Sequence, residues 1–177
     1  DFWRMPHIRS LLLMAVIFSA IASCVPTQKP RTIALNGPFD VEAAELINAK
    51  GDGSIKVQAF MRKNGGGIMT AAGRKISLLP YTDYTNYRIA EIYAGRPFIP
   101  ADEPQPIIEN DPQEYYIFTR TQTADASGST TFKNVADGKY FIVTSVVWKV
   151  GKFYEGGSVN ERVTVKDGEA AEVIIAR

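Results

Sequence analysis

The stretch TADASGSTTFKNVADGKYFIVTSVV, residues 123–147, decides the fold class of this chain of 177 residues. It opens with a polar turn, residues 125–128, that leads into a short strand ending at Phe132. A second turn, residues 134–138, precedes a long run of Tyr, Phe, Ile, Val and Thr, which are the residue types that suit a pleated, half-buried surface. Turns that carry Asp and Gly between two such runs predict a β-hairpin-like unit.

Further strand signals lie on both sides of this unit. From Ile55 to Met61 every second residue is apolar, which is the period of a one-sided strand. The pair Asp167-Gly168 predicts a two-residue hairpin between the last two strands. We predict additional strands over residues 55–62, 72–80, 114–122, 158–166 and 169–176, short helices over 40–50 and 82–94, and a proline-rich loop over 97–112. Seven short strands with little helix predict an all-β fold, a β-sandwich with one or two short helices.

The amino-terminal part of the chain has the features of a secretory signal. Residues 11–22 form an uncharged apolar run preceded by Arg9. This run is too short for a membrane-spanning helix, which needs about 20 apolar residues, and it fits the roughly 7–15 residues of a signal peptide. We therefore predict a cleaved signal peptide over residues 1–23, of which residues 1–4 are an extension upstream of Met5.

The end of the apolar run, Ile21-Ala22-Ser23-Cys24, resembles the lipobox of bacterial lipoproteins. That resemblance implies cleavage before Cys24, a diacylglycerol on its thiol and an acylated amino terminus, which together anchor a chain stably in a membrane. An ordinary signal followed by a chance cysteine is the alternative, but Cys24 is the only cysteine of the chain. Val25 in the next position implies, by resemblance to enterobacterial lipoproteins, sorting to the outer membrane with the domain facing the periplasm. Residues 24–38 are predicted to be a lipidated tether, and residues 39–177 one domain.

A second resemblance covers most of that domain. The pattern comprises a strand led by Gly53, Gly73 before a strand that ends at Pro80, and then Asp125-Ala126-Ser127-Gly128 followed by Phe132, Val135, Gly138 and Tyr140. It resembles the carboxypeptidase regulatory-like family, which implies a seven-strand Greek-key β-sandwich of the transthyretin-like type. The chain departs from that family in residues 81–112, which are longer than a plain member needs, and at Ala136-Asp137, which replaces a proline-rich turn.

The residue inventory argues against catalysis, metal binding and cofactors. The chain holds 20 Lys and Arg against 19 Asp and Glu, and this balance gives no electrostatic footprint for nucleic acid. The only histidine, His7, lies in the predicted signal, so a processed chain has no histidine for a catalytic triad or a metal site. An enzyme would have to use carboxylates alone, and the candidates are Asp102, Glu103, Glu109 and Asp111, which we interpret as the solvated face of the proline-rich loop.

Aromatic residues are the remaining candidates for a ligand or partner surface. Tyr81, Tyr84 and Tyr87 recur every three positions, which could make a stripe for stacking a sugar ring or a partner, or could pack residues 82–94 onto the sandwich. Trp148 is the fourth candidate; with Phe153 and Tyr154 it flanks a turn that is either an exposed tip or a plug at the open end of the sandwich.

These observations give three hypotheses of function. The first is a non-catalytic, membrane-anchored interaction or scaffold module with a protein partner in the cell envelope. The second is a carbohydrate-binding module of the envelope. The third, ranked last, is an enzyme that uses carboxylates alone.

Overall fold

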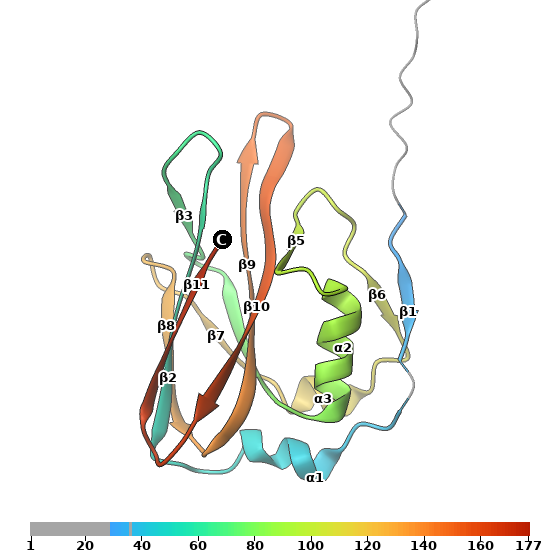
Figure 1. Ribbon diagram of the computed structural model, residues 1–177, viewed down its shortest axis with the longest axis vertical. Coiled ribbons are helices and arrows are strands. Elements are labelled where there is room, and N and C mark those ends of the chain that lie inside the picture. Colours follow the sequence, from blue (N-terminus) through green and yellow to red (C-terminus); the bar gives the residue numbers. More distant parts are fainter. Residues whose placement is uncertain (1–28, 36) are drawn as a thin grey trace, which may run out of the picture.

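The computed structural model describes residues 29–35 and 37–177 (Figure 1). The predicted signal peptide and Cys24 lie outside the described residues, so the predictions of cleavage and lipidation stay predictions. Within the described part of the chain, no helix is both long enough and apolar enough to cross a membrane.

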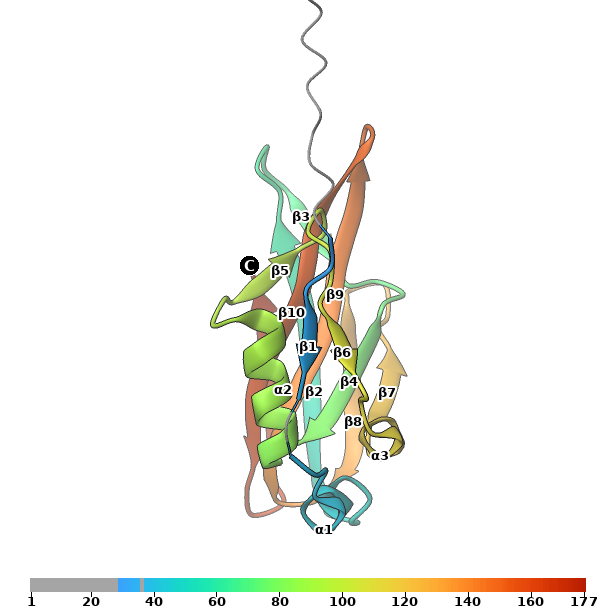
Figure 2. The same cartoon turned by 90° about the vertical axis from the view of Figure 1, so that its right-hand side faces the viewer.

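Two β-sheets face each other, as predicted for an all-β sandwich (Figures 1 and 2). The larger sheet has the order β5 (Phe98–Pro100), β10 (Phe153–Val165), β9 (Gly138–Val150), β4 (Lys75–Pro80) and β7 (Arg120–Thr123). In the smaller sheet, β2 (Gly53–Arg62) pairs in parallel with β11 (Ala170–Ala176) and antiparallel with β3 (Ile68–Thr70) and β8 (Ser129–Val135). A separate parallel pair joins β1 (Thr32–Ala34) to β6 (Ile107–Glu109). The helices are α1 (Val41–Ala44), the 3-10 turn η1 (Glu45–Ile47), α2 (Asp83–Tyr93) and α3 (Gln113–Ile117).

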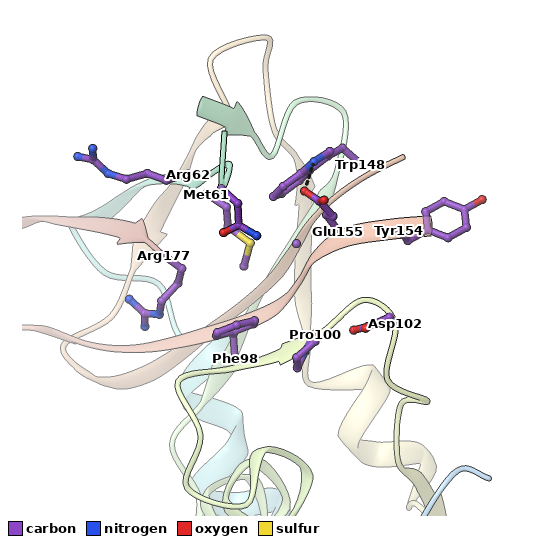
Figure 3. A pocket seen from close by; sticks show the side chains of 11 residues that line it. Met61, Arg62, Phe98, Pro100, Asp102, Trp148, Tyr154, Glu155 and Arg177 are labelled. Carbon is purple, nitrogen blue, oxygen red and sulfur yellow. Dashed lines mark hydrogen bonds between the residues drawn. The ribbon is translucent and has the colours of Figure 1, made fainter. Parts of the chain in front are cut away.

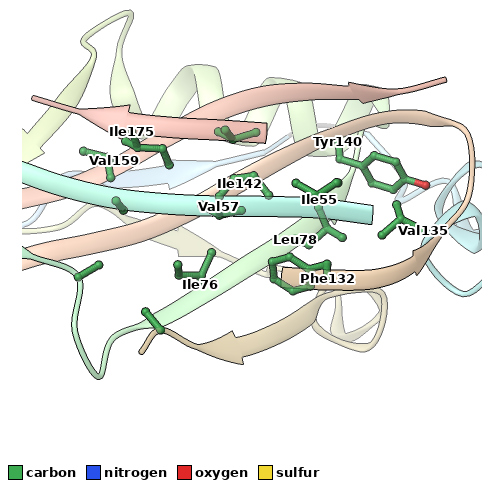
Figure 4. Close-up of a cluster of buried hydrophobic side chains, with 14 of the residues drawn as sticks. Ile55, Val57, Ile76, Leu78, Phe132, Val135, Tyr140, Ile142, Val159 and Ile175 are labelled. Carbon is green, nitrogen blue, oxygen red and sulfur yellow. The ribbon is translucent and has the colours of Figure 1, made fainter. Parts of the chain in front are cut away.

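The main core lies between the two sheets (Figure 4). The predicted alternation of β2 is confirmed, because Ile55, Val57 and Ala59 have no exposed surface. Phe132 of β8 and Tyr140 of β9 meet them from the smaller and the larger sheet. Each large side chain buried in this way stabilises the fold by about 1.5–3 kcal/mol relative to an exposed one.

The two predicted hairpins are wrong, although their strands and turns exist. β8 pairs with β2, whereas β9 pairs with β4 and β10, so the turn at residues 134–138 crosses from one sheet to the other. The turn at Asp167-Gly168 does the same, since β11 pairs with β2. The physical reason is that β4 and β10 occupy both edges of β9, while β2 takes β8 and β11 as its partners, so neither turn can join neighbouring strands of one sheet. Asp137 ties the two crossings together, because its carboxylate accepts hydrogen bonds from the backbone amides of Asp167 and Gly168 at 2.8 and 2.9 Å.

Other boundaries also differ from the prediction. Residues 114–122 do not form one strand: the chain is helical in α3 up to Ile117 and enters β7 only at Arg120. The proline-rich residues 97–112 contain the short strands β5 and β6, and residues 32–34 of the predicted tether form β1. The helix predicted over 82–94 is confirmed as α2, whose first turn is capped by the Thr82 side chain accepting from the Thr85 amide.

A second, smaller core forms on the outer face of the larger sheet. Leu79 of β4 and Phe141 of β9 are buried together with side chains of α2 and α3. Tyr84, Tyr93 and Tyr115 are the aromatic members that these helices supply. The long segment between β4 and β7 is thus an ordered layer packed on the sandwich.

Candidate functional site

An open groove of about 360 Å³ lies at one end of the sandwich, where β2, β5 and the β9–β10 hairpin come together (Figure 3). These elements are distant in the sequence, so the groove exists only in the folded chain. Its lining comprises Met61, Arg62, Asn64, Phe98, Pro100, Asp102, Trp148, Tyr154, Glu155, Gly156 and Arg177.

Trp148 provides the aromatic surface of the groove. It stands opposite Glu155 on the paired strand, and its indole Nε1 donates to Glu155 Oε2 at 3.1 Å. Gly156 has a positive φ of 85°, and a Cβ at this position would clash with the carbonyl oxygen of Val146 and lie 2.6 Å from Cζ3 of Trp148. The missing side chain therefore lets the indole lie close against the hairpin backbone, while the carboxylate fixes its orientation.

Strand β5 supplies a second apolar wall. Its Phe98 and Pro100 pair with Val159 and Gly157 of β10. A Cβ on Gly157 would clash with the carbonyl oxygen of Ile99, so only glycine lets β5 approach this closely. Figure 3 shows Phe98 and Trp148 on two sides of the groove with Met61 between them, and we call these three side chains the apolar floor.

Neutral, negatively charged and positively charged side chains surround this floor. Asn64, Asp102 and Glu155 offer amide and carboxylate groups, and Arg177 offers a guanidinium whose Nη2 lies 3.2 Å from Glu161 Oε2. An apolar floor with a few convergent polar groups is the usual composition of a small-molecule site. Hydrogen-bond donors and acceptors around an aromatic face suit a ligand that has both an apolar face and several hydroxyls.

The four aromatic residues predicted from the sequence do not share one surface. Only Trp148 lies in the groove. Tyr84 is 7% exposed and packs in the second core, so the packing interpretation holds for it. Tyr81 stacks on Phe141 with ring centroids 5.3 Å apart, and Tyr87 is 42% exposed on α2.

The alternatives left open for the β9–β10 turn are also decided. Phe153 and Tyr154 are 74% and 56% exposed, so the turn is an exposed tip, while Trp148 below it is half-buried and packs against the main core.

The candidate carboxylates are partly engaged in structural contacts. Asp111 is held by Arg88, whose Nη2 lies 2.7 Å from Oδ2, and by the hydroxyls of Tyr84 at 2.5 Å and Tyr116 at 2.7 Å. Burial opposes ionisation of Asp111, but these hydrogen bonds outweigh it and hold the pKa of the carboxyl below its usual value. Glu103 pairs with Arg96 at 2.7 Å.

The other two candidates stand apart from these pairs. Asp102 lines the groove, and Glu109 belongs to β6. Among the residues that the structure describes, no three His, Cys, Asp or Glu side chains are grouped so that they could hold a metal ion.

Sequence reasoning missed most of the groove. Met61, Asn64, Phe98 and Arg177 carry no motif, because their role depends on which strands become neighbours. The adjacent pair Gly156-Gly157 was the available signal, since glycine inside a strand often marks a close approach of another group.

Comparisons with known proteins bear on the fold. No protein-family model and no curated protein matches the sequence. A crystal structure of a "putative carbohydrate binding protein" from Pseudomonas aeruginosa is similar, with a TM-score of 0.67 and 22% sequence identity, over 80% of this chain and 99% of that one. At this identity the similarity establishes a shared β-sandwich fold.

Proposed function

We propose that this chain is a non-catalytic carbohydrate-binding domain of the cell envelope, and that the groove beside Trp148 binds a glycan. The observation that carries the proposal is the half-buried indole, fixed by Glu155 and surrounded by amide, carboxylate and guanidinium groups. The description of the similar structure as carbohydrate binding supports the same assignment. It raises the second of the sequence-based hypotheses above the scaffold hypothesis, which stays a prediction.

Binding would use two kinds of contact. The apolar C–H face of a sugar ring stacks on the indole of Trp148, with Phe98 closing the opposite side. Ring hydroxyls then exchange water for hydrogen bonds with Asn64, Asp102 and Arg177 at the rim. Glu155 acts as a positioning residue, because its carboxylate already accepts from the indole N–H.

We also propose a finer description of the fold and of the anchor. Strands β7, β4, β9 and β10 opposed to β8, β2 and β11 would form the seven-strand Greek-key sandwich of the transthyretin-like type, and the strand order of the two sheets supports this. Lipid on Cys24 would hold the domain at the outer membrane, facing the periplasm. Mass spectrometry of the amino-terminal peptide tests the anchor: a diacylglyceryl adduct on Cys24 is expected, and an unmodified, unprocessed amino terminus would contradict it.

Glycan binding is tested by titration with peptidoglycan fragments and other envelope glycans. Trp148 would be the only tryptophan of the processed chain, because Trp3 lies in the predicted signal, so its fluorescence reports on the groove directly. We expect at least one glycan to shift this emission and to give a calorimetric isotherm. Trp148→Ala should abolish the isotherm, and Tyr87→Ala, which removes an exposed ring outside the groove, should leave it unchanged.

Two outcomes would contradict the proposal. Flat traces for all the glycans would argue against glycan binding altogether. Equal losses in the Trp148→Ala and Tyr87→Ala variants would show that binding does not depend on the groove.

A further inference from the structure

The tip of the β9–β10 hairpin, residues 149–154, exposes three large apolar side chains to solvent. We call this segment the hairpin tip. Phe153 is 74% exposed, Tyr154 56% and Val150 47%. Val150 and Phe153 are cross-strand partners, so their side chains stand side by side on one face of the hairpin. Exposed aromatic and aliphatic side chains gathered in this way commonly mark a contact with a protein or a membrane.

The charges of the hairpin tip narrow the choice of partner. Lys149 and Lys152 lie among the apolar residues, and the segment contains no acidic residue. The loop between β2 and β3 lies at the same end of the sandwich and contains Lys63 (Figure 1). Ile68, the first residue of β3 after this loop, is 56% exposed. Aromatic rings combined with lysines suit the headgroup region of a bilayer, where rings settle at the interface and cations attract anionic lipids.

The position of the amino-terminal strand gives an independent reason to expect a membrane at this end. In Figures 1 and 2 the first residues of β1 and the hairpin tip lie toward the same end of the long axis, and α1 lies at the other end. Lys29, the first described residue, lies five positions after Cys24, with four residues between them. A chain of that length spans at most about 18 Å when fully extended. A lipid on Cys24 would therefore bring the membrane to the end that carries the hairpin tip.

We propose that the hairpin tip is a membrane-contact element, which seats this end of the sandwich on the headgroup layer of the membrane that anchors Cys24. Phe153 and Tyr154 enter the interface, and Lys149 and Lys152 face lipid phosphates. The acyl anchor and the hairpin tip would then both contact the membrane, and two contacts fix the orientation of the domain relative to the bilayer. This inference rests on the lipid anchor proposed above, and it does not depend on glycan binding.

The test places a single tryptophan at the tip of the anchored protein. The processed Trp148→Phe protein is reconstituted into vesicles of phosphatidylethanolamine and phosphatidylglycerol that contain a lipid with a nitroxide on its headgroup. Phe153→Trp reports on the tip, and Ile117→Trp, a 64% exposed site on α3, is the matched control. We expect Phe153→Trp to lose most of its fluorescence to the nitroxide and Ile117→Trp to keep its emission. Omitting phosphatidylglycerol should weaken the quenching at position 153.

The possible results distinguish the membrane contact of the hairpin tip from the lipid anchor on Cys24. An acylated Cys24 with an unquenched Phe153→Trp, or with equal quenching at both sites, would overturn the tip contact alone. An unmodified Cys24 in a protein that does not associate with vesicles would overturn the contact together with the anchor. Glycan titration of the same preparation without the Trp148 substitution reports separately on the groove.

Discussion

Replacing Asp111 with asparagine should destabilise the protein substantially, although this residue lies in a segment rich in prolines and turns. The carboxylate is 7% exposed and the Arg88 side chain 14% exposed, and three side chains donate hydrogen bonds to the carboxylate. The Asp111→Asn substitution keeps the volume but removes the charge, so the guanidinium stays buried without its counterion. The Asp111→Asn substitution therefore tests the ion pair and not the packing of the side chain.

The size of the effect follows from the surroundings of Arg88. Breaking a buried ion pair costs about 3–5 kcal/mol of unfolding free energy. We expect about 3 kcal/mol, the lower end, because Arg88 keeps the Tyr115 ring 4.1 Å from its guanidinium carbon and also donates to the Tyr115 hydroxyl. For a domain of this size that corresponds to a melting temperature lowered by roughly 6–12 °C. Thermal unfolding followed by circular dichroism is the assay.

The same ion pair predicts a pH dependence with a definite sign. The pKa of Asp111 is lowered in the folded protein from an ordinary value of 3.8. Its stabilising contribution is therefore fully present above about pH 4 and is lost as the pH falls toward the folded pKa. The stability difference between the wild type and Asp111→Asn should be constant near neutral pH and should shrink below about pH 4, where the carboxyl of the unfolded chain takes up a proton. The difference disappears only when the pH falls below the lowered pKa of the folded protein, where the native carboxyl is neutral as well.

The control is the exposed ion pair between Arg96 and Glu103, whose side chains are 42% and 36% exposed. Glu103→Gln makes the same chemical change and should cost less than about 1 kcal/mol. The double variant Arg88→Met, Asp111→Leu should recover part of the lost stability, since a buried pair can be replaced by apolar side chains. The reasoning is refuted if Asp111→Asn melts within a degree or two of Glu103→Gln.

Two further substitutions test the packing that shapes the core and the groove. Gly156→Ala should lower the melting temperature and shift the fluorescence of Trp148, because the new Cβ would clash with the Val146 carbonyl oxygen and press on the indole. An unchanged emission spectrum would contradict the inference that this glycine makes room for the indole. Phe132→Ala should lower the unfolding free energy by about 3–5 kcal/mol, measured by chemical denaturation, because the ring has no exposed surface. Ile174→Ala is the control and should lower it far less, because that side chain is 57% exposed. Similar losses of unfolding free energy in both variants would contradict the placement of Phe132 in the main core.

The structure shows why local turn signals can misplace a strand. Around residues 134–138 the chain carries the Asn, Asp and Gly that a hairpin would also use. What distinguishes a hairpin from a crossing is whether the next strand forms hydrogen bonds with its predecessor or packs against it across a core. That choice depends on β2 and β4, which take β8 and β9 as partners. Ile55 pairs with Phe132, 77 positions later, and Leu78 pairs with Ile142, 64 positions later.

The amino-acid sequence by itself determined the long strands of the two sheets, since alternation such as that of Ile55, Val57 and Ala59 is a local property of a pleated strand. It did not reveal the short strands β1, β5 and β6 or the helix α3, whose residues carry no such alternation. It also contained the capping residue Thr82 and the start of α2. Only the tertiary structure decided which strands are neighbours. The groove between Trp148 and Phe98, and the burial of Asp111 beside Arg88, follow from that choice, because each joins side chains whose proximity arises from the packing of the whole sandwich.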